Sequence, residues 1–213
     1  ISQPDLGTGL TIILLGLAIL FFVGISIKFV ILCFILLASS IPFIWNQLYD
    51  YQKDRILVFL NPEIDSLGSG YQIIQSKIAI GSGGFFGKGY LLGSQSRLNY
   101  LPEKHTDFIF TLFSEEFGFF GSLFILFLYA IIVWRIVKIG NITRSSFGKL
   151  YCYSFATAFF IYVVVNMMMV LGLLPIVGSP LPIMSYGGSS MMAIMLGLGI
   201  VMSCKVYKDT PVN

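Results

Sequence analysis

This sequence of 213 residues has few charged side chains, three cysteines and a single histidine. Charged residues make up 11% of the chain, against about 25% in soluble domains. Low charge together with 56% hydrophobic residues excludes intrinsic disorder, which needs the opposite balance. The few cysteines exclude a disulfide-stabilised secreted scaffold, and a formal net charge of +3 is too small to indicate nucleic-acid binding. An ordinary cytosolic enzyme is a poor match, which leaves a membrane protein with several spans.

Five apolar stretches are long enough to cross a membrane as helices, because roughly 17–25 residues span hydrocarbon about 30 Å thick. Each stretch is an unbroken run of apolar residues and does not alternate between apolar and polar residues, which favours helices over barrel strands. The stretches are Leu10–Ile27, Phe29–Trp45, Phe117–Trp134, Leu150–Leu174 and Met184–Cys204. The sequence therefore predicts an all-α, polytopic transmembrane helix bundle in a single membrane domain.

The segment between the second and third stretches divides this domain. We expect two transmembrane helices within residues 10–46, a large loop over residues 47–106, and three helices with a tail within residues 107–213. The loop is much longer than a usual connection. It is rich in Ile, Leu, Phe and Tyr, so we expect it to lie on or dip into the membrane surface. The chain begins at Ile1 without a signal peptide, and we interpret it as an internal fragment that begins between two spans.

Basic residues in the short connections indicate the orientation of the spans, because Lys and Arg concentrate on the cytoplasmic side. They fall between spans one and two, between spans three and four, and in the tail. These residues are Lys28, Arg135, Lys138, Arg144, Lys149, Lys205 and Lys208. Their side is therefore predicted to be cytoplasmic, with the tail there too. The large loop and the Pro-rich turn at Pro175–Pro182 are then extracytoplasmic.

The strongest local feature is Leu101–Phe110, where five polar or ionisable residues directly precede an apolar run. Thr106 or Asp107 suits the N-cap of the third span, whose pattern extends back to Asp107, and a capping carboxylate favours the helix dipole. The alternative is a reactive carboxylate at the outer mouth of the bundle, since ionisable groups near hydrocarbon are functional candidates. The two interpretations are compatible.

Two further carboxylates, Glu115 and Glu116, lie about 12 Å deeper than Asp107 if the helix starts there. Carboxylates at that depth face protein or water. Glu115 lies close to the same helix face as Asp107. It is either functional or bonded between helices to a partner such as Asn166.

Two Gly- or Pro-rich segments remain open to more than one interpretation. Gly81–Gly89 is not a P-loop and is a poor dinucleotide fingerprint, so it forms tight surface turns or exposes N–H groups to an anion. The segment before it, Gln72–Ile80, reads as a short amphipathic interfacial helix. The prolines of Pro175–Pro182 block regular helix and predict a re-entrant turn lining a cavity. No metal-ligand cluster stands out in the sequence.

Several long motifs, in order along essentially the whole chain, resemble the SEDS family (shape, elongation, division and sporulation). They are Gln3–Thr8, Gly70–Gly84, Leu101–Phe110 and Pro180–Ser189. Lys77, Gly87–Gly89 and Gln95–Ser96 favour the RodA branch of this family over its FtsW branch. The family fold has ten transmembrane helices, so the resemblance implies that this chain is the C-terminal half and is inactive alone.

The resemblance implies a peptidoglycan glycosyltransferase of the bacterial inner membrane, active in cell elongation and shape maintenance. Such an enzyme polymerises lipid II into glycan strands, releases polyprenyl diphosphate and works with a class B penicillin-binding protein. The family's essential acidic residue falls on Asp107, which acts as general base or holds a divalent cation, Mg²⁺ or Mn²⁺. Substrate-binding candidates are Lys77, Lys88, Arg97, Lys104, His105, Gln75 and Ser185; the four cations among them suit the diphosphate.

Two other classes of function remain open. A polar cavity between spans is also what a flippase for lipid-linked precursors needs. A non-catalytic scaffold that recruits the transpeptidase is the third possibility. Polymerisation by the full-length protein distinguishes the enzyme from both.

Overall fold

The computed structural model describes residues 6–24, 26, 28–29, 31–33, 35–36, 39–40, 50–65, 68–94 and 105–208. Over these residues the chain forms helices and turns and no strand, which confirms the all-α prediction. The helices are α1 (Leu6–Phe22), α3 (Asp50–Leu60), the 3₁₀-helix η1 (Pro62–Asp65), α4 (Ser69–Gly83), α6 (Ile109–Ile142), α7 (Ser146–Val170) and α8 (Gly188–Val206).

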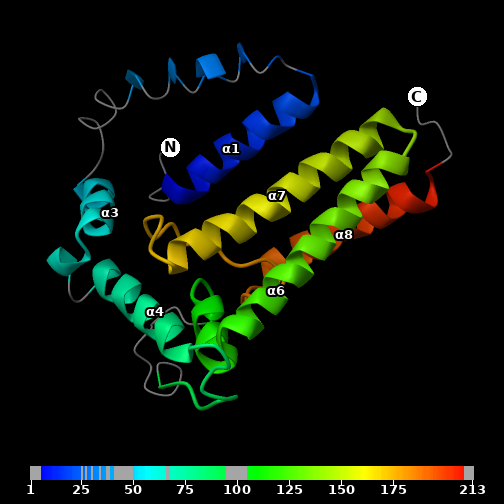
Figure 1. Ribbon diagram of the computed structural model, residues 1–213. Helices are drawn as coiled ribbons and strands as arrows, with labels where there is room; N and C mark the ends of the chain where they lie inside the picture. Colours follow the sequence, from blue (N-terminus) through cyan, green and yellow to red (C-terminus); the bar gives the residue numbers. More distant parts are fainter. Residues whose placement is uncertain are drawn as a thin grey trace.

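Three of the described helices, α6, α7 and α8, are long and apolar enough to cross a membrane. They run side by side, and α1 lies along α7 (Figure 1). These three match the last three predicted spans, with α6 starting close to Asp107 as its pattern predicts. Helix α1 is 17 residues long and ends at Phe22 rather than at Ile27. Much of the predicted span Phe29–Trp45 lies outside the described residues.

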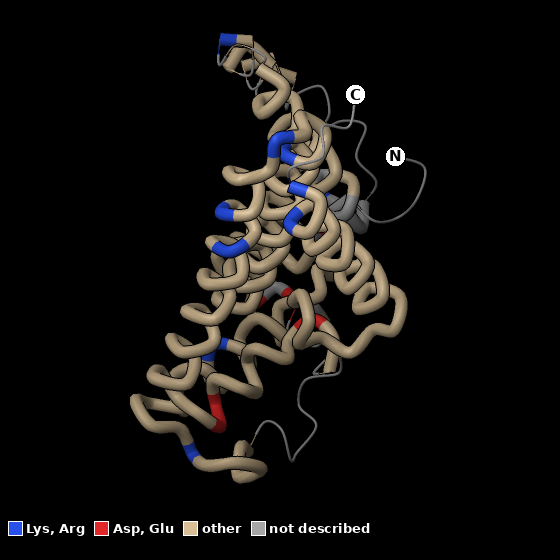
Figure 2. Tube along the Cα trace, turned by 90° about the vertical axis from the view of Figure 1, so that its right-hand side faces the viewer, with Lys and Arg blue, Asp and Glu red and all other residues tan. Residues whose placement is uncertain are grey.

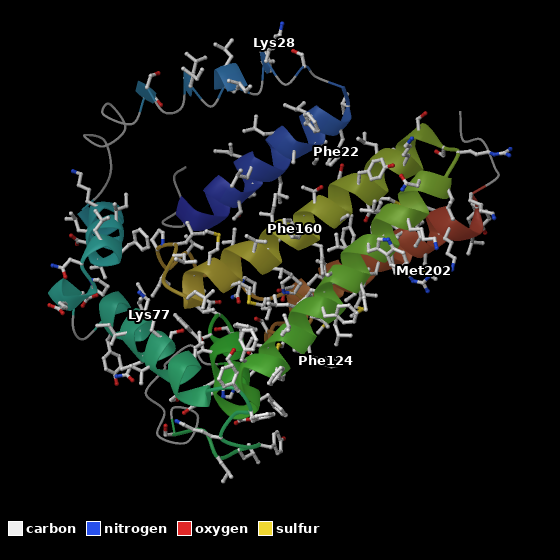
Figure 3. All side chains as sticks on the ribbon, in the orientation of Figure 1. Phe22, Lys28, Lys77, Phe124, Phe160 and Met202 are labelled. Atoms are coloured by element: carbon white, nitrogen blue, oxygen red, sulfur yellow. The ribbon has the colours of Figure 1, made fainter. Side chains whose placement is uncertain are left out.

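The core lies between α6 and α7, while the outward faces of the long helices remain apolar. Phe108, Phe159 and Met169 are buried in this core. By contrast, Phe124 on α6 and Phe160 on α7 are 59% and 54% exposed, and both are labelled in Figure 3 with Phe22 and Met202. Large apolar side chains around the whole circumference are typical of helices surrounded by lipid.

Charged residues are sorted along the long axis of the molecule. In Figure 2 most Lys and Arg segments lie in the upper half of the tube, and the Asp and Glu segments lie in the lower half. The upper end carries the short turn between α6 and α7. There the hydroxyl of Ser145 caps α7 by accepting a hydrogen bond from Gly148 N at 3.3 Å.

The large loop folds into α3, η1 and α4 at the opposite end of the bundle (Figure 1). Helix α4 contains the predicted amphipathic segment and packs mainly on α6. The hydroxyl of Ser76 explains this docking, because it bonds Thr111 Oγ1 of α6 at 2.8 Å and donates to Val170 O of α7 at 2.7 Å. Ser76 is fully buried, so α4 is fixed to the ends of both spanning helices.

Helix α6 breaks at Gly118, and the glycine-rich turn after α4 fills the break. Gly118 has φ +67°, and a Cβ there would lie 2.3 Å from Gly87 N. The N–H groups freed by the break donate to this turn, Phe119 N to Gly84 O at 2.9 Å and Phe120 N to Phe85 O at 3.2 Å. The glycines therefore permit close backbone pairing, which satisfies polar groups at a helix break.

Candidate functional site

Three consecutive backbone carbonyls hold the turn at residues 105–108 that precedes α6. His105 O accepts a hydrogen bond from Tyr186 N at 2.9 Å, and Thr106 O accepts one from Ser185 Oγ at 2.6 Å. Asp107 O accepts one from the side-chain amide of Asn166 at 2.8 Å. The backbone that carries Asp107 is thus tied to α7 and to the Pro-rich segment rather than left as a free loop.

Asp107 lies outside α6, one residue before the N-cap position. The N-cap is Phe108, a buried core residue, and α6 begins at Ile109. The prediction that Thr106 or Asp107 is the N-cap is therefore wrong, because burial of the Phe108 ring fixes where the helix starts. The Asp107 side chain is half-buried, and a Cβ added to Gly178 would lie 3.6 Å from Asp107 Oδ2. The carboxylate therefore borders the Pro-rich turn.

The Pro-rich segment from Leu171 to Gly187 contains no regular helix, as its prolines predict. Its carbonyls are bonded by the bundle: Tyr129 donates to Pro182 O at 2.6 Å, and Asn166 donates to Ser179 O at 2.6 Å. Ser185 adds a hydrogen bond within the segment, since its Oγ accepts one from Leu181 N at 2.7 Å. Irregular backbone of this kind is stable at membrane depth only against protein or a polar cavity.

A shallow cavity of about 440 Å³ opens beside this segment. His105 and Ser185, both predicted as substrate-binding residues, line it together with Tyr186 and Met191. His105 and Tyr186 are exposed, whereas Ser185 is buried. The structure therefore brings two of the predicted residues together at the turn that carries Asp107.

Lys77 approaches the same segment from α4 (Figure 3). Its side chain is exposed and reaches the turn after α7, where a Cβ on Gly172 would lie 2.7 Å from Lys77 Nζ. Lys77 and Asp107 thus border one irregular segment, at Gly172 and at Gly178 respectively. Gln75, another predicted residue, is half-buried on α4.

Lys88 makes a different contact, an ion pair with Glu115. Its ammonium lies 2.7 Å from Glu115 Oε1, and the same oxygen accepts from the backbone and hydroxyl of Ser94, each at 2.9 Å. Glu115 is 0% exposed, so these three donors compensate a buried charge. The predicted bond between Glu115 and Asn166 is therefore wrong, because the turn after α4 supplies the partner and Asn166 bonds backbone carbonyls.

Two predicted cations, Arg97 and Lys104, lie outside the described residues. In the part of the chain that the structure describes, no group of three or more His, Cys, Asp or Glu side chains is placed to hold a metal.

Sequence reasoning missed the residues that position the site. Ser76 and Thr111 fix α4, and Gly178 makes room beside the Asp107 carboxylate. Asn166 was visible as a polar residue within an apolar span, but its partners are backbone carbonyls far away in sequence. Its amide oxygen and the Ser179 hydroxyl are buried without a hydrogen-bond partner among the described residues.

Comparison with known proteins shows the family to which the chain belongs. A model of the FtsW/RodA/SpoVE family, described as cell cycle protein, matches residues 1–210. The chain is 48% identical over 208 residues to the peptidoglycan glycosyltransferase MrdB of Escherichia coli K12, covering 97% of this chain and 56% of that protein. It is 40% identical over 205 residues to a probable peptidoglycan glycosyltransferase FtsW of Trichlorobacter lovleyi, covering 95% of this chain and 53% of that one.

Two solved structures with a similar fold support the same family. A chain from a study of how a peptidoglycan synthase complex coordinates polymerization and crosslinking superposes with TM-score 0.81 at 30% identity, covering 98% of this chain and 57% of that chain. RodA of Thermus thermophilus superposes with TM-score 0.62 at 25% identity, covering 98% and 52%. The chain spans about half the length of the curated relatives it matches. It belongs to the FtsW/RodA/SpoVE family, which is the SEDS family that its motifs resemble.

Proposed function

We propose that the protein to which this chain belongs is a peptidoglycan glycosyltransferase that polymerises lipid II during cell elongation. The observation that carries the proposal is the triple backbone anchor of residues 105–107, which fixes one half-buried carboxylate beside an irregular, cavity-lining segment. A carboxylate held in a fixed position is what proton abstraction from a sugar hydroxyl requires. Relatives with the name peptidoglycan glycosyltransferase support the reaction class.

In this proposal Asp107 takes the proton of the acceptor's GlcNAc hydroxyl. The hydroxyl oxygen attacks the anomeric carbon of the donor, and the bond from that carbon to the lipid diphosphate breaks. Lys77 faces the leaving diphosphate, because its exposed ammonium borders the same segment as Asp107. Lys88 is less suited to this role, since Glu115 and Ser94 hold its ammonium. His105 and Ser185 line the cavity on the acceptor side.

A divalent cation at Asp107 is the alternative role for the same carboxylate. Mg²⁺ commonly takes one or two carboxylates and fills its remaining positions with water and substrate phosphates. Asp107 with the diphosphate fits that arrangement, and a bound cation supplies positive charge against the leaving group. The two roles differ in metal dependence: chelation stops polymerisation if Asp107 is a metal ligand and leaves the rate unchanged if Asp107 is only a base.

We also propose that the large loop and the Pro-rich segment face outward from the inner membrane and that the tail is cytoplasmic. The concentration of Lys and Arg at the opposite end supports this orientation (Figure 2). The similarity to a chain of a peptidoglycan synthase complex supports a class B penicillin-binding protein as partner.

The test compares two aspartate variants of the intact, purified protein in polymerisation of lipid II. Asp107→Ala is expected to abolish glycan polymer, whereas Asp54→Ala, which removes an exposed carboxylate of the same loop, is expected to retain it. Glycan polymer made by Asp107→Ala at the wild-type yield contradicts the assignment of the site.

Translocation of lipid II without polymer by the wild-type protein contradicts the proposed enzyme and favours a flippase. Neither activity, with the partner still bound, favours a scaffold.

A further inference from the structure

The turn that follows α4 exposes an unusual set of large apolar side chains, which we name the aromatic turn and define as residues 85–92. Phe86 is 83% exposed, Tyr90 71% and Phe85 68%. Leu91 and Leu92 follow at 60% each. A continuous apolar surface of this kind marks a contact with a partner or a membrane.

The rings of the aromatic turn continue onto the outward face of α6. Phe86 lies 5.4 Å from Phe120 between ring centroids, and Phe85 lies 6.3 Å from both Phe119 and Phe120. Phe119 and Phe120 are themselves more than half exposed. They begin the apolar outer surface that runs on through Phe124 down the spanning part of α6. The aromatic turn is therefore an extension of the exposed apolar face of α6.

The depth of this contact follows from the break in α6. From Phe119 to Lys138, which with Arg135 begins the basic end, the helix is about 30 Å long at a rise of ~1.5 Å per residue, and this matches hydrocarbon about 30 Å thick. Its far end reaches Arg144, where basic residues gather. The break at Gly118 then lies at the opposite boundary between hydrocarbon and headgroups. Tyr and Trp side chains concentrate at this boundary, and the aromatic turn carries Tyr90 and the polar Lys88–Glu115 pair there.

We propose that the aromatic turn inserts into the leaflet on the side of the large loop, with Phe85 and Phe86 at the boundary between acyl chains and headgroups. The occupant is lipid, because the turn is continuous with the lipid-facing side of α6 and lies one hydrocarbon thickness from the basic end. Hydrogen bonds from the backbone of Lys88 and Gly89 to the carbonyls of Glu115 and Glu116 fix the turn to the first part of α6. Insertion therefore fixes the depth of the break in α6, from which the first part of α6 leads back to the Asp107 turn (Figure 1). This proposal does not depend on the reaction proposed above.

Tryptophan fluorescence in lipid vesicles tests the insertion. The intact protein is prepared with its native tryptophans, Trp45 and Trp134 among them, replaced by phenylalanine, and one tryptophan is introduced. Phe86→Trp and Leu92→Trp report on the aromatic turn, and Phe124→Trp is the matched control within the lipid-facing part of α6. Each variant is measured in phosphatidylcholine brominated either near the glycerol or near the bilayer centre, and with acrylamide as the aqueous quencher.

The proposal predicts that tryptophan at 86 and 92 loses more fluorescence to bromine near the glycerol, with weak quenching by acrylamide. Phe124→Trp is expected to lose more to bromine near the bilayer centre, which also shows that the background folds and inserts. Strong acrylamide quenching at 86 and 92 without loss to either brominated lipid, while Phe124→Trp is quenched by lipid, overturns the proposal. That result places the turn in water. Weak quenching by acrylamide and by both brominated lipids also overturns the proposal, because it places the turn against protein.

Discussion

The side-chain amide of Asn166, near the C-terminal end of the spanning helix α7, donates to the backbone carbonyl of Asp107 at 2.8 Å. The same nitrogen donates to Ser179 O at 2.6 Å. One buried amide thus joins α7, the turn before α6 and the Pro-rich segment. Because Asn166 is 0% exposed, water cannot replace either bond, and the position of the Asp107 backbone depends on this residue.

Asn166→Asp keeps the size of the side chain but removes the donor, so two buried carbonyls then face a carboxyl group. Each buried group left unsatisfied costs about 1–3 kcal/mol. We expect a lower unfolding temperature and a large loss of polymerisation. The control is Asn141→Asp, which changes an exposed asparagine at the other end of the bundle. It is expected to change the unfolding temperature and the polymerisation little. Equal behaviour of the two variants contradicts the structural role of Asn166.

The Ser185 hydroxyl bonds two backbone groups from different segments, Leu181 N and Thr106 O. Ser185→Ala removes both bonds at a buried position and is expected to destabilise the protein by about 1–3 kcal/mol. Because Thr106 adjoins Asp107, we also expect a lower polymerisation rate. The measurement is thermal unfolding together with the rate at saturating lipid II. Ser189→Ala, at an exposed position, serves as the control. A Ser185→Ala variant that is as stable and as active as Ser189→Ala contradicts the prediction.

The break in α6 requires glycine at position 118. Gly118 has φ +67°, and a Cβ there would lie 2.3 Å from Gly87 N. Gly118→Ala therefore combines backbone strain of about 1–3 kcal/mol with a clash against rigid backbone. Gly199→Ala in α8 meets nothing within 4 Å and is expected to be neutral or to stabilise by up to about 1 kcal/mol. Unfolding temperatures of the two variants in detergent check this contrast, and a Gly118→Ala variant as stable as wild type refutes it.

The Lys88–Glu115 pair predicts an asymmetry between two substitutions. Lys88→Met takes the ammonium from a carboxylate that is 0% exposed, and breaking a buried pair in this way costs about 3–5 kcal/mol. Glu115→Gln costs less, because the Lys88 side chain is 31% exposed and water can hydrate it.

Thermal unfolding of both variants and of the double variant measures this asymmetry. We expect the double variant to recover part of the stability that Lys88→Met loses, since no buried charge then remains unpaired. A larger loss from Glu115→Gln than from Lys88→Met is the result that contradicts the account.

Hydropathy was sufficient to predict the spanning helices that the structure describes, because each long apolar run must satisfy its backbone within a helix. The start of α6 was harder to predict. Asp107 has a good capping side chain, but the Phe108 ring needs burial and takes the N-cap position. The break at Gly118 was not predicted, since its apolar surroundings read as continuous helix and the cause is pairing with the distant residues 84–89.

The site was predictable as a set of residue types but not as a network. Asp107 stands out in the sequence as an ionisable residue before an apolar run, and His105 and Ser185 do meet at one cavity. The partners of Asn166 and Glu115 were predicted wrongly, because hydrogen bonds between residues far apart depend on how helices pack. Lys88 illustrates the same limit: its charge suggested a diphosphate, whereas the fold pairs it with Glu115.

The most direct test of the central claim is the polymerisation rate of Asp107→Asn in the intact protein, measured with its unfolding temperature in the same preparation. Asparagine keeps the size of the side chain and leaves the backbone carbonyl that Asn166 binds, but it neither takes up a proton nor carries negative charge. The account predicts an unchanged unfolding temperature and no glycan polymer. Polymer formed at the wild-type rate by a stably folded Asp107→Asn variant contradicts it.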